Sequence, residues 1–182
     1  MKILRKQELE TKDIIIGDQI QIELKGIGIF TATAQKIDSE GILFMFDECV
    51  GMQPMNKKNT NEGGFEKSDL SKWLQSEFRK ILPDTLSKRI KNITLPTYGQ
   101  IFGHDLFYKI KLAEDNDDQF ILMKNIKNRI STYKNDTEWY WLQNSVKPDL
   151  SSTFFAYVNH YGNANYHFAN GSHGVRPVFH FV

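Results

Sequence analysis

The amino-acid sequence predicts an α+β fold of antiparallel strands with two helices in the N-terminal half. Residues 14–48 alternate apolar and polar side chains with a period of two, which indicates half-buried strands. Residues 68–91 instead carry apolar side chains three and four positions apart, which indicates amphipathic helices. Short strand-like runs then resume over residues 106–182. Strands, helices and strands grouped in this order are typical of the α+β class.

The first strands form a predicted antiparallel meander. Ile20, Ile22 and Leu24 alternate with polar residues, so one face of this strand is expected to be buried. A second strand is expected over residues 27–37 and a third over residues 42–46. The sequence KG separates the first two strands and DSEG separates the last two, and both are turn-forming.

Two helices are predicted after a polar segment. Residues 51–64 are rich in Asn and Gly, which favours a mobile loop. Ser68 is a suitable N-cap for the helix that follows, and Pro83 ends that helix. Asp84 can cap a second helix that continues to Lys91. The apolar face of the first helix is expected to consist of Leu70, Trp73, Leu74, Phe78 and Ile81.

The C-terminal half is predicted to consist of short strands. Asn170-Gly171 favours a type I′ hairpin turn, because both residues tolerate positive φ. We expect a single domain over residues 14–182, preceded by an extension over residues 1–13. The strands are expected at residues 106–112, 120–123, 138–142, 154–158, 166–169 and 175–181.

The composition indicates a chain that folds without disulfide bonds. It also gives no sign of a charged partner. Hydrophobic residues make up 40% of the 182 residues, and Cys49 is the single cysteine, expected to be a buried apolar side chain. A formal net charge of +1 gives no field that would attract nucleic acid. No apolar run is long enough for a signal peptide or a membrane span. We expect a soluble protein, cytoplasmic as synthesised, with no nucleic-acid or membrane partner.

Residues 150–175 form the most distinctive segment of the chain. They contain no Asp, Glu, Lys or Arg, and they are rich in Asn, His, Tyr, Phe, Ser and Gly. Rigid aromatic rings and adaptable amide groups are typical of recognition surfaces, although a polar hairpin with packed edge rings has the same composition. The residues predicted to contact a ligand are Asn159, His160, Tyr161, Asn163, Asn165, Tyr166, His167, Asn170 and His173.

Metal and catalytic chemistry are not favoured by the sequence. Four of the five histidines lie in the last 23 residues, but their spacings of 7, 6 and 7 do not preorganise metal ligands. Residues 114–118 are acidic, yet they lack the glycine and the distant glutamate of an EF-hand calcium loop. No standard catalytic motif is present, and no histidine or lysine lies near Cys49 in the sequence. We therefore predict no metal, no cofactor and no enzymatic activity.

Several motifs resemble those of one domain family. The runs WYWLQN at 139–144, FAYVN at 155–159 and GVRPVF at 174–179 resemble the pattern WWLRS…F.YV…G…GVRPAF. That pattern belongs to an uncharacterised domain family of bacterial and phage proteins. Two upstream runs, SDLSKWL at 68–74 and LPTYGQIF at 95–102, also fit this family. Gln143 and Asn144 replace the last two residues of WLRS, so the family's arginine is absent here.

The resemblance extends to a wider fold. The terminal pattern is similar to the C-type-lectin-like fold of sulfatase-modifying factors and of the variable proteins of diversity-generating retroelements. The resemblance therefore implies a C-type-lectin-like fold, with lectin-like strands over residues 106–182. Variable proteins display Asn, Tyr, His and Ser just before the last strand, which is where residues 159–173 lie.

Three residues of these motifs are expected to have structural roles. Arg176 is predicted to be a clamp on the terminal strand, because a partly buried guanidinium needs several acceptors. Direct contact of Arg176 with a ligand is the alternative. Trp139 and Trp141 are predicted to lie in the core.

The leading prediction is a noncatalytic recognition domain of bacterial or prophage origin that binds a protein or a glycan. The alternative is an assembly module, such as a subunit of a phage particle or surface complex, in which the same segment packs against another chain of an oligomer. An enzyme of the sulfatase-modifying type is the third hypothesis.

Overall fold

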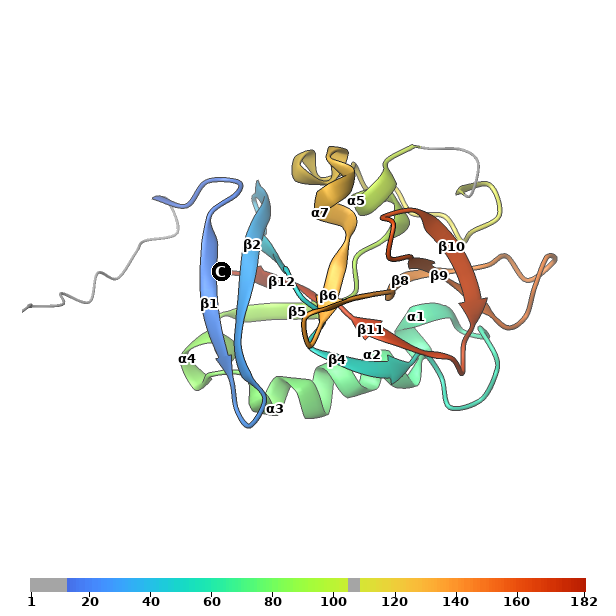
Figure 1. Ribbon diagram of the computed structural model, residues 1–182, viewed down its shortest axis with the longest axis horizontal. Coiled ribbons are helices and arrows are strands. Elements are labelled where there is room, and N and C mark those ends of the chain that lie inside the picture. Colours follow the sequence, from blue (N-terminus) through green and yellow to red (C-terminus); the bar gives the residue numbers. More distant parts are fainter. Residues whose placement is uncertain (1–12, 105–108) are drawn as a thin grey trace, which may run out of the picture.

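The computed structural model describes residues 13–104 and 109–182, and in these residues strands dominate the regular structure (Figure 1). They form two five-stranded sheets and one two-stranded sheet. The predicted α+β class with a C-type-lectin-like fold is wrong. The helices are short, and the last strand joins the N-terminal meander instead of the other C-terminal strands. The predicted extension over residues 1–13 lies almost wholly outside the described residues.

The first sheet contains the predicted meander and two later strands. Its antiparallel order is β1-β2-β3-β12-β5, so the C-terminal strand pairs with the third N-terminal strand. The strands are β1 (Gln19–Leu24), β2 (Gly28–Asp38), β3 (Gly41–Phe46), β12 (Val178–Phe181) and β5 (Ile90–Thr94).

A β-bulge interrupts the pairing of β2 with β3. Ala34 faces Phe44 and Lys36 faces Leu43, so Gln35 is an extra residue on β2. Bulges bend a strand and re-aim the side chain of the extra residue. Gln35 is only 3% exposed, although its neighbour Lys36 is exposed on the surface.

The second sheet carries the uncharged segment. Its order is β10-β9-β8-β11-β4, and β8 and β11 are parallel. Part of the predicted loop over residues 51–64 is therefore a strand. The strands are β10 (Ala164–Phe168), β9 (Phe154–Val158), β8 (Tyr140–Ser145), β11 (Ser172–Val175) and β4 (Gly51–Pro54).

The predicted hairpin at Asn170-Gly171 is wrong. This turn joins β10 to β11, but β10 pairs with β9 whereas β11 pairs with β8 and β4. Neither turn residue has a positive φ. Two consecutive positive φ values instead occur at Lys134 and Asn135, in the two-residue loop between β6 (Ser131–Tyr133) and β7 (Asp136–Glu138).

The predicted first helix is present with a π-helical middle. It begins after Ser68, whose side chain accepts a hydrogen bond from the Ser71 amide, as predicted for the N-cap. The second helix is shorter than predicted, because Ile90 enters β5 and pairs with Phe181. The helices are α1 (Gly64–Lys67), α2 (Asp69–Trp73), η2 (Leu74–Phe78), α3 (Arg79–Ile81), α4 (Asp84–Ser87), α5 (Tyr98–Phe102), η3 (Ile121–Lys124) and α7 (Ile126–Arg129).

Two other predicted strands are not formed as expected. Residues 121–124 form the 3₁₀ helix η3 instead of a strand over 120–123. The predicted strand over 106–112 lies partly outside the described residues, and Leu112 makes a single bridge to Val146. None of the helices in residues 13–104 and 109–182 has the length and apolar character that crossing a bilayer requires.

Two hydrophobic clusters lie on opposite faces of the sheets. Phe44 and Phe46 of β3 belong to one cluster, and Met45 between them belongs to the other. Trp141 of β8 joins the first cluster, and its neighbour Tyr140 joins the second. Because both faces of β3 and of the first half of β8 are buried, residues 42–46 and 140–142 are continuously apolar and do not alternate.

Candidate functional site

The nine residues predicted to contact a ligand surround β9 and β10, but only some of them face solvent. Four are exposed, three histidines point toward aromatic rings, and two have structural contacts. The exposed residues are Tyr161, Asn163, Asn165 and Asn170. The histidines are His160, His167 and His173, and the residues with structural contacts are Asn159 and Tyr166.

Asn159 organises the loop between β9 and β10. Its Oδ1 accepts hydrogen bonds from the Tyr161 amide at 2.9 Å and the Asn163 amide at 3.1 Å. Gly162 has a φ of 78°, and a Cβ there would lie 2.9 Å from Ile126 Cγ1. The Asn159 side chain and the close packing at Gly162 therefore stabilise the conformation of the 159–163 loop. Asn159 Oδ1 thus accepts its hydrogen bonds from within the protein.

Six aromatic rings form one cluster. Four belong to residues of β8, β9, β10 and β11, and two belong to residues next to β8 and β9 in the chain. Trp139 stacks on Tyr157 with ring centroids 4.9 Å apart, and Tyr157 stacks on His173 at 5.3 Å. Trp141 meets His173 edge to face at 4.5 Å and also donates its Nε1 hydrogen to the Gln53 carbonyl. We call Trp139, Trp141, Tyr157, His160, His167 and His173 the ring cluster.

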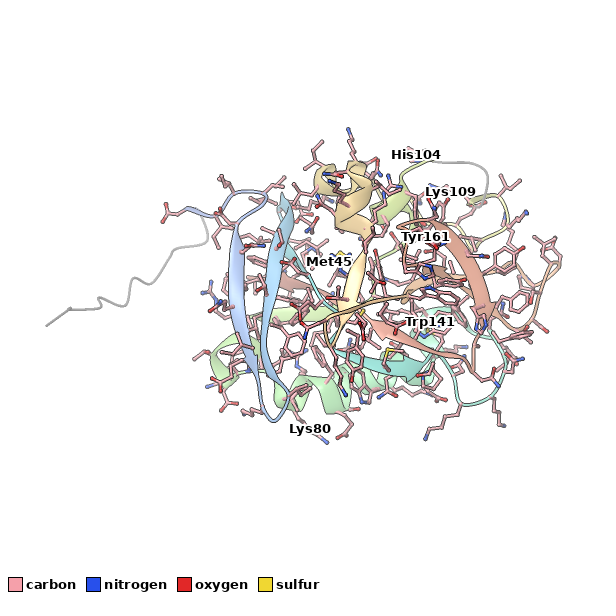
Figure 2. The ribbon with its side chains drawn as sticks, viewed as in Figure 1. Met45, Lys80, His104, Lys109, Trp141 and Tyr161 are labelled. Carbon is pink, nitrogen blue, oxygen red and sulfur yellow. The ribbon has the colours of Figure 1, made fainter. Side chains whose placement is uncertain are left out.

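The ring cluster extends to the surface at Tyr161. Trp139 Nε1 donates to His160 Nδ1 at 2.5 Å, and the two rings are stacked. His160 in turn meets Tyr161 edge to face with centroids 4.1 Å apart. Tyr161 is 67% exposed, whereas Trp141 is fully buried. Figure 2 labels both side chains. The rings therefore lead from the core to one exposed aromatic side chain.

His173 and His167 are two histidines in contact inside this cluster. Their ring centroids are 4.8 Å apart, and neither His173 Nε2 nor His167 Nδ1 has a hydrogen-bond partner in the described part of the chain. Burial, and secondly the proximity of His167, lowers the pKa of His173 to about 4. His173 is therefore neutral at pH 7.

We expect the folded state to lose stability in acid because of His173. Its pKa is about 4 when folded and 6.5 when unfolded, so the unfolded chain binds the proton more tightly. Above pH 6.5 His173 does not lower the free energy of unfolding. As the pH falls from 6.5 toward 4, the free energy of unfolding decreases by about 3 kcal/mol in total. Urea unfolding measured at a series of pH values gives this slope.

The matched variants for this measurement are His173→Phe and His104→Gln. His173→Phe keeps an aromatic ring in the cluster and should flatten the stability profile between pH 6.5 and 4. His104 is exposed, so His104→Gln should leave the wild-type slope. A wild-type slope in His173→Phe would assign the acid sensitivity to other groups.

Metal-ligating side chains do not converge in the described residues. Among residues 13–104 and 109–182, no group of three or more His, Cys, Asp or Glu is placed to hold a metal ion. The acidic loop over residues 114–118 has internal partners. Asp115 accepts hydrogen bonds from the Gly99 amide and from Asn144 Nδ2, and Asp117 accepts one from the Thr97 hydroxyl.

Cys49 is a buried thiol. Burial raises its pKa to about 11, so the reactive thiolate is scarce at neutral pH. Its sulfur lies 3.4 Å from the Ser131 hydroxyl. A Cβ at Gly174 would collide with the Cys49 sulfur, which explains why a residue without a side chain follows His173.

The structure places the three residues predicted to be structural in or beside the core. Trp141 is fully buried and Trp139 is half-buried against the first hydrophobic cluster. Arg176 is 4% exposed. Its Nε donates to the Phe46 carbonyl at 2.8 Å, and its Nη1 donates to the Asn128 carbonyl at 3.1 Å.

Two polar residues that sequence reasoning missed are also buried. Asn61 Nδ2 donates to the carbonyls of Val146 and Ser151, both at 2.9 Å, and to that of Phe154 at 3.1 Å. Gln35 lines a cavity. No periodic pattern marks either position, although the break in the alternation of β2 near Gln35 is visible in the sequence.

Comparison with known proteins adds one match. A family model described as "Domain of unknown function (DUF6273)" matches residues 39–181, which is most of the chain. The matched region begins in the turn before β3 and includes both the ring cluster and Arg176. No curated protein and no solved structure matches the chain.

Proposed function

The chain belongs to the domain family of unknown function DUF6273, and we propose that it is a noncatalytic recognition domain that binds a neutral glycan. The observation that carries this proposal is Tyr161, an aromatic ring that is 67% exposed at the tip of an ordered loop. The bacterial or prophage origin implied by the motifs stays a prediction.

The preorganisation of Tyr161 supports a binding role. Asn159 holds the Tyr161 backbone, and the Trp139–His160 stack supports its ring from below. A side chain that is already ordered loses little entropy when a ligand binds. About two-thirds of this side chain is in contact with water, and apolar surface left in water contributes nothing to the stability of the fold.

The chemistry around Tyr161 favours a neutral polar ligand. Residues 150–175 carry no charged side chain, so this segment itself offers no ion pair to a charged partner. The charged residue that packs beside Gly162 is Arg129 of α7, whose Nε already donates to the Met123 carbonyl. Asn163 and Asn165 are exposed beside the ring and offer amide groups. A sugar has an apolar C–H face that can stack on an aromatic ring and hydroxyl groups that can bond to amides. A glycan meets both requirements.

The noncatalytic part of the proposal is supported by the state of the cysteine. The Cys49 thiol is buried and its pKa is raised to about 11, which opposes nucleophilic chemistry at neutral pH. An enzyme of the sulfatase-modifying type would need a reactive cysteine thiolate, which this buried thiol does not supply at neutral pH.

We expect Tyr161→Ala to weaken glycan binding by at least about tenfold, as is typical when an aromatic anchor is truncated. The measurement is binding of the full-length chain to an array of immobilised neutral oligosaccharides, followed by titration of any oligosaccharide that is bound. Phe168→Ala is the matched control, because Phe168 is also an exposed ring but lies at the end of β10, outside the 159–163 loop, and packs on Phe154. The control should bind as the wild type does.

Two results would overturn this proposal. One is equal glycan affinity of the wild type and Tyr161→Ala. The other is a wild-type chain that binds no neutral oligosaccharide but forms an oligomer that Tyr161→Ala dissociates. That second result would make the 159–163 loop an assembly surface.

A further inference from the structure

A second polar site lies away from the ring cluster, between the first sheet and α7. A cavity of about 270 Å³ is lined by residues of β1, β2, η3 and α7 together with Arg176. Figure 1 shows α7 beside the upper part of β2, and Arg176, two residues before β12, donates to the Asn128 carbonyl of α7. The volume is at the lower limit of small-molecule sites, which are roughly 300–1,000 Å³. The polar residues that matter here are Gln19, Thr33, Gln35, Asp47, Lys127 and Arg176.

Gln35 brings an unsatisfied polar atom to this cavity. Its side chain is more than nine-tenths buried, and among the residues that the structure describes its Oε1 has no hydrogen-bond partner. Its Nε2 donates to the Thr33 carbonyl at 3.3 Å. Turning the amide over would leave the nitrogen unpartnered instead, so one amide atom lacks a partner in either orientation. A buried unpaired amide atom is destabilising, and the β-bulge at Gln35 is what directs this residue inward.

Arg176 brings an unpaired positive charge to the same cavity. Its Nε and Nη1 donate to two backbone carbonyls and to the Tyr140 hydroxyl, which are all uncharged acceptors. Within residues 13–104 and 109–182, no carboxylate forms an ion pair with Arg176, and nothing accepts from its Nη2. A buried guanidinium is stabilised by an anion, and a planar carboxylate suits it best.

The other charges of the cavity define the ligand further. Asp47 is held by the Thr33 hydroxyl at 2.6 Å and by Gln19 Nε2 at 3.0 Å, so its carboxylate is fixed beside the cavity. Lys127 lines the cavity from the exposed face of α7. Two cationic side chains and one anionic side chain favour a ligand with a carboxylate and a smaller group that donates a hydrogen bond.

We propose that this cavity binds a small carboxylate with a hydrogen-bond donor on its α-carbon, as in α-amino acids and α-hydroxy acids. The ligand carboxylate accepts from Arg176 Nη2, and its amino or hydroxyl group donates to Gln35 Oε1. This site is separate from the glycan surface at Tyr161, because none of the residues that line this cavity belongs to the 159–163 loop or to the ring cluster.

The test uses three ligands of the same skeleton and the full-length chain. L-alanine, L-lactate and isobutyrate carry an ammonium, a hydroxyl and a methyl group on the same carbon. We expect calorimetry to show that L-alanine or L-lactate binds at least about tenfold more tightly than isobutyrate, because only they satisfy Gln35. Equal binding of all three, or no binding at millimolar concentration, would overturn the proposal. L-alanine and L-lactate also separate the two ligand classes.

Gln35→Met and Lys127→Ala test the two ends of the site. Gln35→Met removes the unpartnered oxygen at similar volume, so the ligand-free protein should melt no lower than the wild type, and the preference over isobutyrate should disappear. Lys127→Ala should weaken binding of every carboxylate severalfold. Lys80→Ala is the control, because Lys80 is an exposed lysine on α3 at the far side of the molecule (Figure 2). Undiminished preference in Gln35→Met would refute the assignment.

Discussion

Replacing Arg176 by methionine is expected to lower the free energy of unfolding by about 4 kcal/mol. The guanidinium donates to the carbonyls of Phe46 and Asn128 and to the Tyr140 hydroxyl. These acceptors lie on β3, α7 and β8, so one side chain connects both large sheets to a helix. Methionine keeps the length of the stem and leaves all three acceptors without this donor. Urea unfolding of the two proteins measures the loss.

Arg129→Met is the matched control for this measurement. Arg129 is half-buried, and its Nε donates to one carbonyl, that of Met123, at 2.7 Å. We expect this variant to lose about 1 kcal/mol. Similar losses in both variants would mean that Arg176 contributes one ordinary hydrogen bond and does not clamp the sheets. Arg176→Lys should recover only part of the loss, because an ammonium cannot reproduce the fork of the guanidinium.

Replacing Asn61 by aspartate is expected to lower the free energy of unfolding by about 4 kcal/mol as well. The Asn61 side chain is 6% exposed and donates to three backbone carbonyls. An aspartate of the same shape would direct a negatively charged oxygen at those carbonyls and would supply no donor at neutral pH. Thermal and urea unfolding at pH 7 give the loss.

The control for Asn61 is Asn92→Asp on the exposed face of β5. A surface substitution of this kind changes stability by at most about 0.5 kcal/mol. Asn61→Ala should fall between the two, because it removes the donor but adds no charge. If Asn61→Asp is as stable as Asn92→Asp, the segment after β4 is not held by this amide and behaves as the mobile loop that its composition suggests.

Local patterns in the sequence predicted the elements that depend on neighbouring residues. The alternation from Ile20 to Leu24, the N-cap at Ser68 and the apolar face of the first helix are all present. They are predictable because period and capping are properties of a short segment. Part of the candidate site was also predictable, since the uncharged composition of residues 150–175 led to Tyr161 and to its amide neighbours.

Predictions of elements were wrong where the element depends on pairing with a segment far away in the sequence. Asn170-Gly171 has the composition of a hairpin turn, but the strands on either side pair elsewhere. Ile90 fits a helix, yet it completes the edge of a sheet beside Phe181. The predicted fold class was wrong for the same reason, because β12 pairs with β3, from which most of the sequence separates it.

The sequence by itself determined the meander, the main helix and the buried Trp141. It named Tyr161 only as one of nine residues of a predicted surface, and the structure decided which of the nine are exposed. The tertiary structure alone decided that His160, His167 and His173 enter a ring cluster, and that Gln35, Asp47 and Arg176 surround one cavity. The physical reason is the range of the interactions. Local periodicity reports which face of a segment is apolar, whereas a cavity or a ring cluster forms only where strands far apart in sequence become neighbours.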